Sequence, residues 1–427
     1  MLESVFGEDA DVLRDRDFQA MLLANLLAPL GVTLLSPILS ALTGPFAVSS
    51  ARIGLLISAY TAPPIFLIPV AGLLADRYGR KPMLLTGIVL FGIGGTAIAF
   101  TTDFRVAVAL RFLQGIGFAG LTPIIITSLG DIYDGSAEAT AQGLRFTSSG
   151  VYQSIFPPLA GLLVGVGWQY PFFIYALAFP AALAVFFWFD EPTRDATADR
   201  DSTSDPEATD GGAEPTGGRL RRLAGVVRKP RVVSLVIGRT LPMISWTGFL
   251  TYNSVVVVTL MNGSEGQAGL LVTVNSVMLA VGGSQAGRIT AAFDSRLWPL
   301  TAANVGLGGG LALVALAPSI ATAAVGAAML GVGFGVSLSL YRSIVTGLAP
   351  ATLRGSLVSV AESLGRVGST ITPIGMSALI GLAAPALGFD DAVRWVAVGV
   401  GAFVLIGGQV CLVVARLSPK TDAEQSV

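Results

Sequence analysis

Twelve long apolar runs, separated by short polar stretches, constrain this sequence more than any other feature. A membrane-spanning helix needs about 20 consecutive apolar residues. The runs lie at roughly 18–42, 52–75, 82–101, 105–130, 139–165, 169–189, 232–260, 267–288, 297–317, 319–346, 355–381 and 391–415. Only 12% of the 427 residues are charged, whereas soluble domains carry about 25%. The sequence therefore predicts an all-α membrane protein with twelve transmembrane helices.

The titratable residues exclude several other classes of protein. The net charge of −1 excludes a generally basic nucleic-acid-binding protein. The chain has no histidine and one cysteine, Cys411, which excludes a histidine-based catalytic triad, a structural zinc site and an intrachain disulfide. We therefore expect neither an enzyme nor a metal or cofactor site, and the expected surroundings are a lipid bilayer.

The distribution of basic residues predicts which helix ends face the cytoplasm. Positive charges gather in cytoplasmic loops, and with both termini inside, the outer loops hold only Arg52, Arg105 and Arg394. We therefore expect cytoplasmic termini and a location in the plasma membrane. The expected layout is a first six-helix bundle at 1–189, a second at 232–416 and a cytoplasmic tail at 417–427. Residues 190–231 form a cytoplasmic linker that is first acidic and disordered and then basic along the inner leaflet.

A nearly constant spacing relates the two halves of the chain. Residues 54–58 (GLLIS) recur as 269–273 (GLLVT), and 115–119 (GIGFA) recur as 331–335 (GVGFG). Gly150 and Pro158 likewise recur as Gly365 and Pro373, so every match has an offset of 215 (269 − 54) or 216 (331 − 115) positions. Transporters with parallel repeats hold their substrate near the membrane midplane, between the repeats. We therefore expect two pseudo-symmetric six-helix bundles with a site between them.

The loop between the second and third runs carries the most specific motif. Residues 72–81, GLLADRYGRK, resemble the loop signature of the major facilitator superfamily, complete and at the family's spacing. The resemblance implies that this loop latches the cytoplasmic gate while the protein is open to the outside. A basic loop that only orients the helices is the alternative. The expected gating residues are Gly72 in a close helix contact, Gly79 in a tight turn, and Asp76, Arg77, Arg80 and Lys81.

Two further motifs of this family lie in the fourth and fifth runs. Residues 110–119 resemble the second motif, in which an intramembrane arginine precedes Gln-Gly. An arginine inside a span costs at least about 2.5 kcal/mol, so we expect Arg111 and Gln114 to form a polar site, with a snorkelling arginine as the alternative. Residues 150–161 resemble the motif of the family's exporters, with Pro157 in place of the usual glycine. The expected hinge residues are Gly150, Pro157, Pro158, Gly161 and Pro373.

Glu362 is the only acidic residue that falls well inside a run. It either pairs with Arg366, one turn later on the same helix face, or acts as the proton-coupling carboxylate, and the sequence leaves both open. Drug/proton antiporters of this family often carry an acidic residue in the first or fourth helix, where this sequence has none. The other candidate substrate or coupling residues are polar side chains within the runs: Arg145, Tyr152, Gln153, Arg239 and Asn275.

The resemblance covers nearly the whole chain outside the linker and the tail, and it points to the family's drug and metabolite efflux permeases. It implies a monomeric secondary transporter that works by alternating access and exports small amphipathic or hydrophobic molecules in exchange for protons. Five arginines stand against one glutamate within the runs, which favours an alternative: uptake or export of an organic anion or a sugar, with or without proton coupling. A membrane receptor that binds its ligand without moving it is a further alternative.

Overall fold

The computed structural model describes residues 12–191, 224–293, 295, 297–349 and 351–419. Over these residues, twelve helices are long and apolar enough to cross a membrane. The predicted all-α membrane fold with twelve spans is therefore confirmed. Residues 192–223 of the predicted linker and 420–427 of the predicted tail lie outside the described residues.

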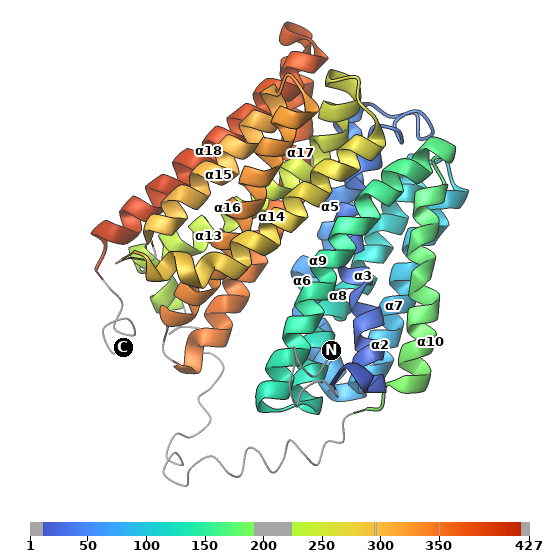
Figure 1. The fold of residues 1–427 in the computed structure, drawn as a ribbon, viewed down its shortest axis with the longest axis vertical. Helices are drawn as coiled ribbons and strands as arrows, with labels where there is room; N and C mark the ends of the chain where they lie inside the picture. Colours follow the sequence, from blue (N-terminus) through green and yellow to red (C-terminus); the bar gives the residue numbers. More distant parts are fainter. Residues whose placement is uncertain (1–11, 192–223, 294, 296, 350, 420–427) are drawn as a thin grey trace.

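The first six spans form one bundle (Figure 1). Several of these spans are interrupted, and proline, which lacks a backbone donor, follows some of the breaks, as Pro63 does at the start of α6. In chain order the segments are α2 (Arg16–Asn25), α3 (Leu27–Thr33) and η2 (Ser36–Ile38); α4 (Ser50–Ile53), α5 (Leu55–Thr61) and α6 (Pro63–Tyr78); α7 (Arg80–Thr96) and η3 (Ala97–Phe100); α8 (Phe104–Ile132); α9 (Gly135–Val166); and η4 (Tyr170–Leu177) with α10 (Ala178–Trp188).

The last six spans form the second bundle, with longer continuous helices. They are α13 (Pro230–Ser254) with the π-helical segment η6 (Val255–Leu260), α14 (Glu265–Ala291), α15 (Leu297–Leu316), α16 (Ile320–Gly347), α17 (Ala351–Leu387) and α18 (Phe389–Leu417). The start of α14 is fixed by a capping box, in which Ser264 and Gln267 each accept from the other's backbone N–H, satisfying two orphan donors of the first turn.

Each bundle has its own buried apolar core. The core of the first bundle draws its residues from Val12 to Phe189, and the cores of the second draw theirs from Val232 to Ala415. Inside a membrane, helices associate through close packing of small residues rather than through the hydrophobic effect. Glycines provide this packing at equivalent places: a Cβ on Gly117 would lie 2.5 Å from Gly87 O, and a Cβ on Gly333 would lie 2.7 Å from Ala303 O.

The internal repeat of the sequence appears as equivalent backbone contacts. A Cβ on Gly115 would lie 2.3 Å from Tyr60 O in the first bundle, and a Cβ on Gly331 would lie 2.3 Å from Asn275 O in the second. The two glycines and their two partners are separated by 216 (331 − 115) and 215 (275 − 60) positions. The spacing found in the sequence therefore marks structurally equivalent positions of the two bundles.

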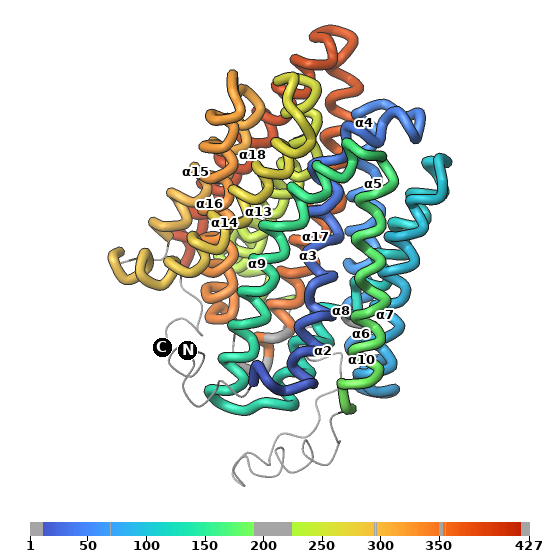
Figure 2. The backbone as a smooth tube through the Cα atoms, turned by 45° about the vertical axis from the view of Figure 1, so that its right-hand side comes forward, coloured from blue at the N-terminus to red at the C-terminus, as the bar shows by residue number. Residues whose placement is uncertain are grey.

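The two bundles touch at one end and diverge toward the other (Figures 1 and 2). We call the end where α2 and α13 begin and α10 and α18 finish the terminal face, and the opposite end the distal face. Hydrogen bonds join the bundles in the distal half, where Ser40 N donates to Ser254 Oγ over 3.1 Å and Ser58 Oγ donates to Thr370 O over 2.9 Å. Near mid-span, Thr273 Oγ1 of α14 donates to the backbone oxygen of Ser154 in α9 over 2.7 Å. The bundles are thus closed at the distal face and separated toward the terminal face.

Candidate substrate cavity between the bundles

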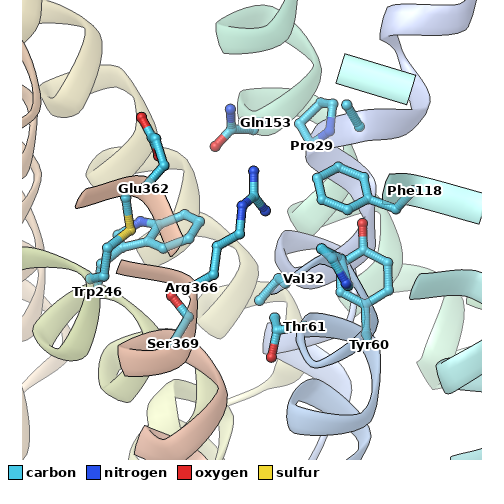
Figure 3. A pocket seen from close by; sticks show the side chains of 13 residues that line it. Pro29, Val32, Tyr60, Thr61, Phe118, Gln153, Trp246, Glu362, Arg366 and Ser369 are labelled. Carbon is cyan, nitrogen blue, oxygen red and sulfur yellow. The ribbon is translucent and has the colours of Figure 1, made fainter. Parts of the chain in front are cut away.

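A cavity of about 240 Å³ lies between the two bundles, near the middle of the spans. Both bundles line it: α3, α5, α6, α8 and α9 on one side, and α13 and α17 on the other. Its walls combine three aromatic rings with five polar side chains (Figure 3). The rings are Tyr60, Phe118 and Trp246, and the polar side chains are Thr61, Gln153, Glu362, Arg366 and Ser369. The expectation of a site between two bundles is therefore matched by a cavity with aromatic and charged walls.

Glu362 is held by an arginine of a different helix. Arg239 of α13, only 4% exposed, forms an ion pair and a hydrogen bond with Glu362 Oε1 and also donates to Ala361 O over 3.0 Å. Arg342 of α16 lies 3.8 Å from the same carboxylate oxygen. The pairing of Glu362 with Arg366 that we considered from the sequence is not what the structure has, because the carboxylate turns toward α13 and α16. Glu362 is 34% exposed, so it stays accessible from the cavity.

Arg366 points into the centre of the cavity (Figure 3). Its guanidinium lies 5.9 Å from the centroid of the Phe118 ring, which belongs to the other bundle. Such a cation–π contact attracts the arginine toward the ring face. Among the residues that the structure describes, Arg366 has no hydrogen-bond or ion-pair partner within the usual distances.

Other predicted residues of α9 and α14 lie on or beside the cavity. Gln153 lines it directly, whereas the neighbouring Tyr152 packs on Phe156 with ring centroids 6.3 Å apart. Asn275 is buried and accepts a hydrogen bond of 3.2 Å from the indole of Trp246. Trp246 in turn stacks on Phe334 at 5.2 Å. Asn275 therefore fixes a wall of the cavity without facing it.

Arg145 lies on the same helix as Gln153, nearer the terminal face. Its Nε donates to Gln142 over 3.0 Å, and its Nη1 donates to Asn25 Oδ1 of α2 over 3.4 Å. Arg145 does not line this cavity. It lies between the cavity and the terminal face.

Arg111 and Gln114 occupy the interior of the first bundle rather than the cavity. Arg111 is fully buried, so it does not snorkel, and its ring contact is with Tyr60 at 4.6 Å. Its guanidinium donates four hydrogen bonds: to Gly31 O (2.5 Å), Leu56 O (3.1 Å), Gln114 Oε1 (2.6 Å) and Tyr175 OH (3.3 Å). These partners lie in spans one, two, four and six. Arg111 and Gln114 thus form a buried hydrogen-bonded cluster whose geometry fits a cross-link that positions Tyr60 at the cavity wall. Their role as substrate or coupling residues stays a prediction.

The signature loop is bound to the ends of its own bundle. Gly79 has a φ of +98°, a conformation that favours glycine and permits the tight turn between α6 and α7. The Glu191 carboxylate accepts from the backbone N–H groups of Arg80 (2.5 Å) and Lys81 (2.8 Å), and so caps α7. The Arg80 side chain lies 2.5 Å from Asp131 at the end of α8. Sequence reasoning missed both acids, although each directly flanks a span on the side of the basic loop.

One of the predicted glycine roles differs from what the structure has. A Cβ on Gly72 would meet no atom within 4 Å, so the close helix contact expected there is absent from the described residues. Gly150 lines the space between α9 and α14 and also has no atom within 4 Å of an added Cβ. Its role as a hinge stays a prediction.

The remaining predicted hinge residues lie where the bundles cross. Pro157, Pro158 and Gly161 belong to the continuous helix α9, and they face α14 of the other bundle. A Cβ on Gly161 would lie 2.3 Å from Glu265 O, and a Cβ on Gly269 would lie 2.6 Å from Pro157 O. On the opposite side of the molecule, Pro373 of α17 lies beside Gly54. These residues therefore form interbundle contacts, and their role as hinges stays a prediction.

Comparison with known proteins agrees with the fold and the motifs. The family model described as Major Facilitator Superfamily matches residues 21–262. The bacillibactin exporter of Bacillus subtilis (strain 168) is 35% identical over 154 residues, which cover 34% of this chain and 38% of that protein. Multidrug resistance protein MdtL of Escherichia coli O81 (strain ED1a) is 25% identical over 369 residues, or 84% of this chain and 87% of that protein. The chain thus matches well under half of the bacillibactin exporter but most of MdtL.

Solved structures share the fold at low identity. A bacterial homologue of the human lysosomal transporter Spinster, in an inward-facing and occupied conformation, has a TM-score of 0.74 at 18% identity, with 93% of this chain and 96% of that chain covered. The nucleoside transporter NupG (D323A mutant) has a TM-score of 0.74 at 12% identity, with 93% and 100% covered. At these identities the likeness concerns the fold alone.

Proposed function

Because this chain belongs to the Major Facilitator Superfamily, we propose that it is a monomeric secondary transporter that exports small amphipathic or hydrophobic molecules in exchange for protons. The observation that carries the proposal is the cavity between the bundles, which holds one carboxylate, Glu362, among aromatic walls. Both bundles that enclose it come from one chain, so a single copy is sufficient for the site. The names of the relatives, a bacillibactin exporter and multidrug resistance proteins, support export.

The terminal face is the cytoplasmic face in this proposal. The positive-inside rule supports this orientation, since Arg77, Arg80 and Lys81 lie at the terminal face between α6 and α7. The chain then has cytoplasmic termini in the plasma membrane, and the described conformation is open to the cytoplasm and closed to the outside. In the alternate conformation, the terminal face closes and the signature loop latches it.

Glu362 is the proposed proton carrier. In the cytoplasm-open conformation its carboxylate is paired with the buried Arg239. In the proposed cycle, this ion pair forms once the proton has been released to the cytoplasm. Proton uptake from outside then requires α13 and α17 to move apart, so that the ion pair between Arg239 and Glu362 breaks.

The proposal is tested in liposomes with a trapped pH-sensitive dye and an imposed pH gradient. Lipophilic cations, organic anions, neutral amphipaths and sugars are added in turn to wild type, Glu362→Gln and a control, Asp390→Asn, whose carboxyl group is exposed at the start of α18. We expect proton movement on addition of one amphipathic class, lost in Glu362→Gln and unchanged in Asp390→Asn. Flux that persists in Glu362→Gln with full proton movement would contradict the role of this carboxylate.

A further inference from the structure

One charged group of the cavity forms no ion pair within the part of the chain that the structure describes. The Glu362 carboxylate is bound by Arg239 and approached by Arg342. Arg366, one turn from Glu362, is attracted by it only at longer range and extends toward the cavity centre (Figure 3). A charge inside a membrane protein is expensive unless it is paired or reaches water. The Arg366 guanidinium can therefore pair with an anionic group of a bound molecule.

Two further arginines lie between the cavity and the terminal face. Arg145 of α9 and Arg342 of α16 come from opposite bundles, and their charges repel each other. The side chain of Arg342 is 68% exposed. Closing the terminal face would bring the two bundles together with these like charges between them. A bound anion would reduce this repulsion, whereas a bound cation would increase it.

A larger apolar cavity adjoins the charged one. It has a volume of about 750 Å³, lies between α9 and α14, and shares Gln153, Met243 and Trp246 with the first cavity. Its other walls are mostly aliphatic or aromatic, including Val151, Ile155, Val277, Val281, Phe334 and Leu338. Pockets of about 300–1,000 Å³ hold drug-sized ligands, with a few polar groups to orient them. Together, the two cavities can hold a molecule with one charged end and an apolar body.

We infer, on the premise of the transport function proposed above, that the substrate is an amphipathic organic anion. Its carboxylate, sulfonate or phenolate group pairs with the Arg366 guanidinium, and its apolar body occupies the cavity between α9 and α14. An aromatic ring on the substrate packs against Phe118 or Trp246. Arg366 thereby selects substrates by their charge. Glu362, which is paired with Arg239, does not bind the substrate and exchanges protons instead.

The test uses three tritiated probes that share one naphthylalkyl skeleton and end in a carboxylate, a primary amide or a trimethylammonium group. Binding is measured by scintillation proximity on the full chain in lipid nanodiscs. We expect the carboxylate to bind more tightly than the other two. Arg366→Gln should weaken carboxylate binding by about tenfold to a hundredfold, the range for loss of a charged hydrogen bond, and leave amide binding unchanged. Arg366→Lys should keep part of the preference for the carboxylate.

Arg288→Gln is the matched control, because Arg288 is exposed at the end of α14 and bonds only to Gln285 in the part of the chain that the structure describes. It should leave the binding of all three probes unchanged. The inference is overturned if the ammonium or the amide binds wild type as tightly as the carboxylate, a result that needs no variant to fold. It is also overturned if Arg366→Gln weakens all three probes equally.

Flux measurements with the same probes in liposomes separate this inference from the proposed function. Flux of the ammonium probe, without preferential carboxylate binding, would retain a transporter and reject the anion site. Preferential, Arg366-dependent binding of the carboxylate, without any flux, would retain the anion site and reject transport.

Discussion

The two bundles meet along two crossings that the internal repeat relates to each other, and these crossings are not equally tight. Gly269 and Pro158 form the contact between α14 and α9, and their equivalents Gly54 and Pro373 form the contact between the start of α5 and α17. At the first crossing, a Cβ on Gly269 would meet backbone atoms of Pro157 and Pro158 at 2.6–2.7 Å. At the second, a Cβ on Gly54 would meet side-chain atoms, Thr251 Cγ2 at 2.8 Å and Pro373 Cβ at 3.5 Å.

This difference shows that one glycine–proline pair in a repeat can serve two kinds of contact. The α9–α14 crossing is backbone against backbone, so it fixes the distance between two helices. The α5–α17 crossing relies on side chains and hydroxyl groups, with Ser58 Oγ donating to Thr370 O and Thr370 Oγ1 donating to Thr61 Oγ1 over 3.0 Å. We therefore expect the first crossing to act as the pivot and the second to loosen first when the distal face opens.

The largest effect is expected at the tight crossing. Gly269→Ala places a methyl group against backbone that cannot move without moving the helix, and overpacking of this kind costs about 1–3 kcal/mol. The distal-closed conformation should therefore lose population, and transport should fall. Double electron–electron resonance between spin labels at Val166 of α9 and Leu387 of α17, in a chain whose Cys411 is replaced by serine, measures the distal distance.

Gly266→Ala is the control for this prediction, because it lies one turn away on α14, where a Cβ would meet side-chain atoms only at 3.6 Å or more. It should leave the distal distance unchanged. A Gly269→Ala protein with the wild-type distance distribution would show that the α9–α14 crossing is not the tight one.

A smaller effect is expected at the looser crossing. Gly54→Ala meets a methyl group of Thr251 at 2.8 Å and the ring of Pro373 at 3.5 Å. A side chain can give way more easily than backbone, so the cost should be smaller than at Gly269, about 1 kcal/mol. The same spin-label pair reports it. An effect of Gly54→Ala that equals or exceeds that of Gly269→Ala would reverse the proposed order of the two crossings.

The smallest effect concerns the hydroxyl groups of the looser crossing. Thr61→Val removes the partner of Thr370 Oγ1, and interhelical hydrogen bonds in membranes contribute about 0.6 kcal/mol on average. We expect a slight shift toward distal opening in the same distance measurement. Thr86→Val, whose hydroxyl bonds to Pro82 O of its own helix, should give no shift, and equal shifts in both variants would mean that the interbundle bond has no specific role.

The sequence predicted the features that depend on one helix or on a repeated pattern. Twelve apolar runs became twelve spans, and the offset of the repeat matched equivalent contacts such as Gly115 with Tyr60 and Gly331 with Asn275. The loop at 72–81 has its turn at Gly79, as its glycine indicated. These features depend on hydropathy, turn geometry and spacing, which are local properties of a chain.

The partners of the charged residues could not be predicted in this way, because they depend on the rotational orientation of each helix against its neighbours. Spacing along one helix pointed from Glu362 to Arg366, whereas the carboxylate is bound by Arg239, 123 positions away. One signal was available: Glu362 is the only acid deep in a run, so each arginine in a run was a possible partner. The snorkelling alternative for Arg111 failed for the same reason, because backbone oxygens of Gly31 and Leu56, on two other spans, bind it inside the bundle.

Alternating access requires the two faces to open in turn, so two distances measured on the same sample test it. One spin-label pair at the terminal face, Phe187 of α10 with Leu417 of α18, and one at the distal face, Val166 with Leu387, each join opposite bundles at exposed positions. Both are measured in proteoliposomes with and without a pH gradient and the bound naphthylalkyl carboxylate. We predict that the terminal distance shortens as the distal distance lengthens. Transport that proceeds while neither distance changes, or while both change in the same direction, would rule out alternating access.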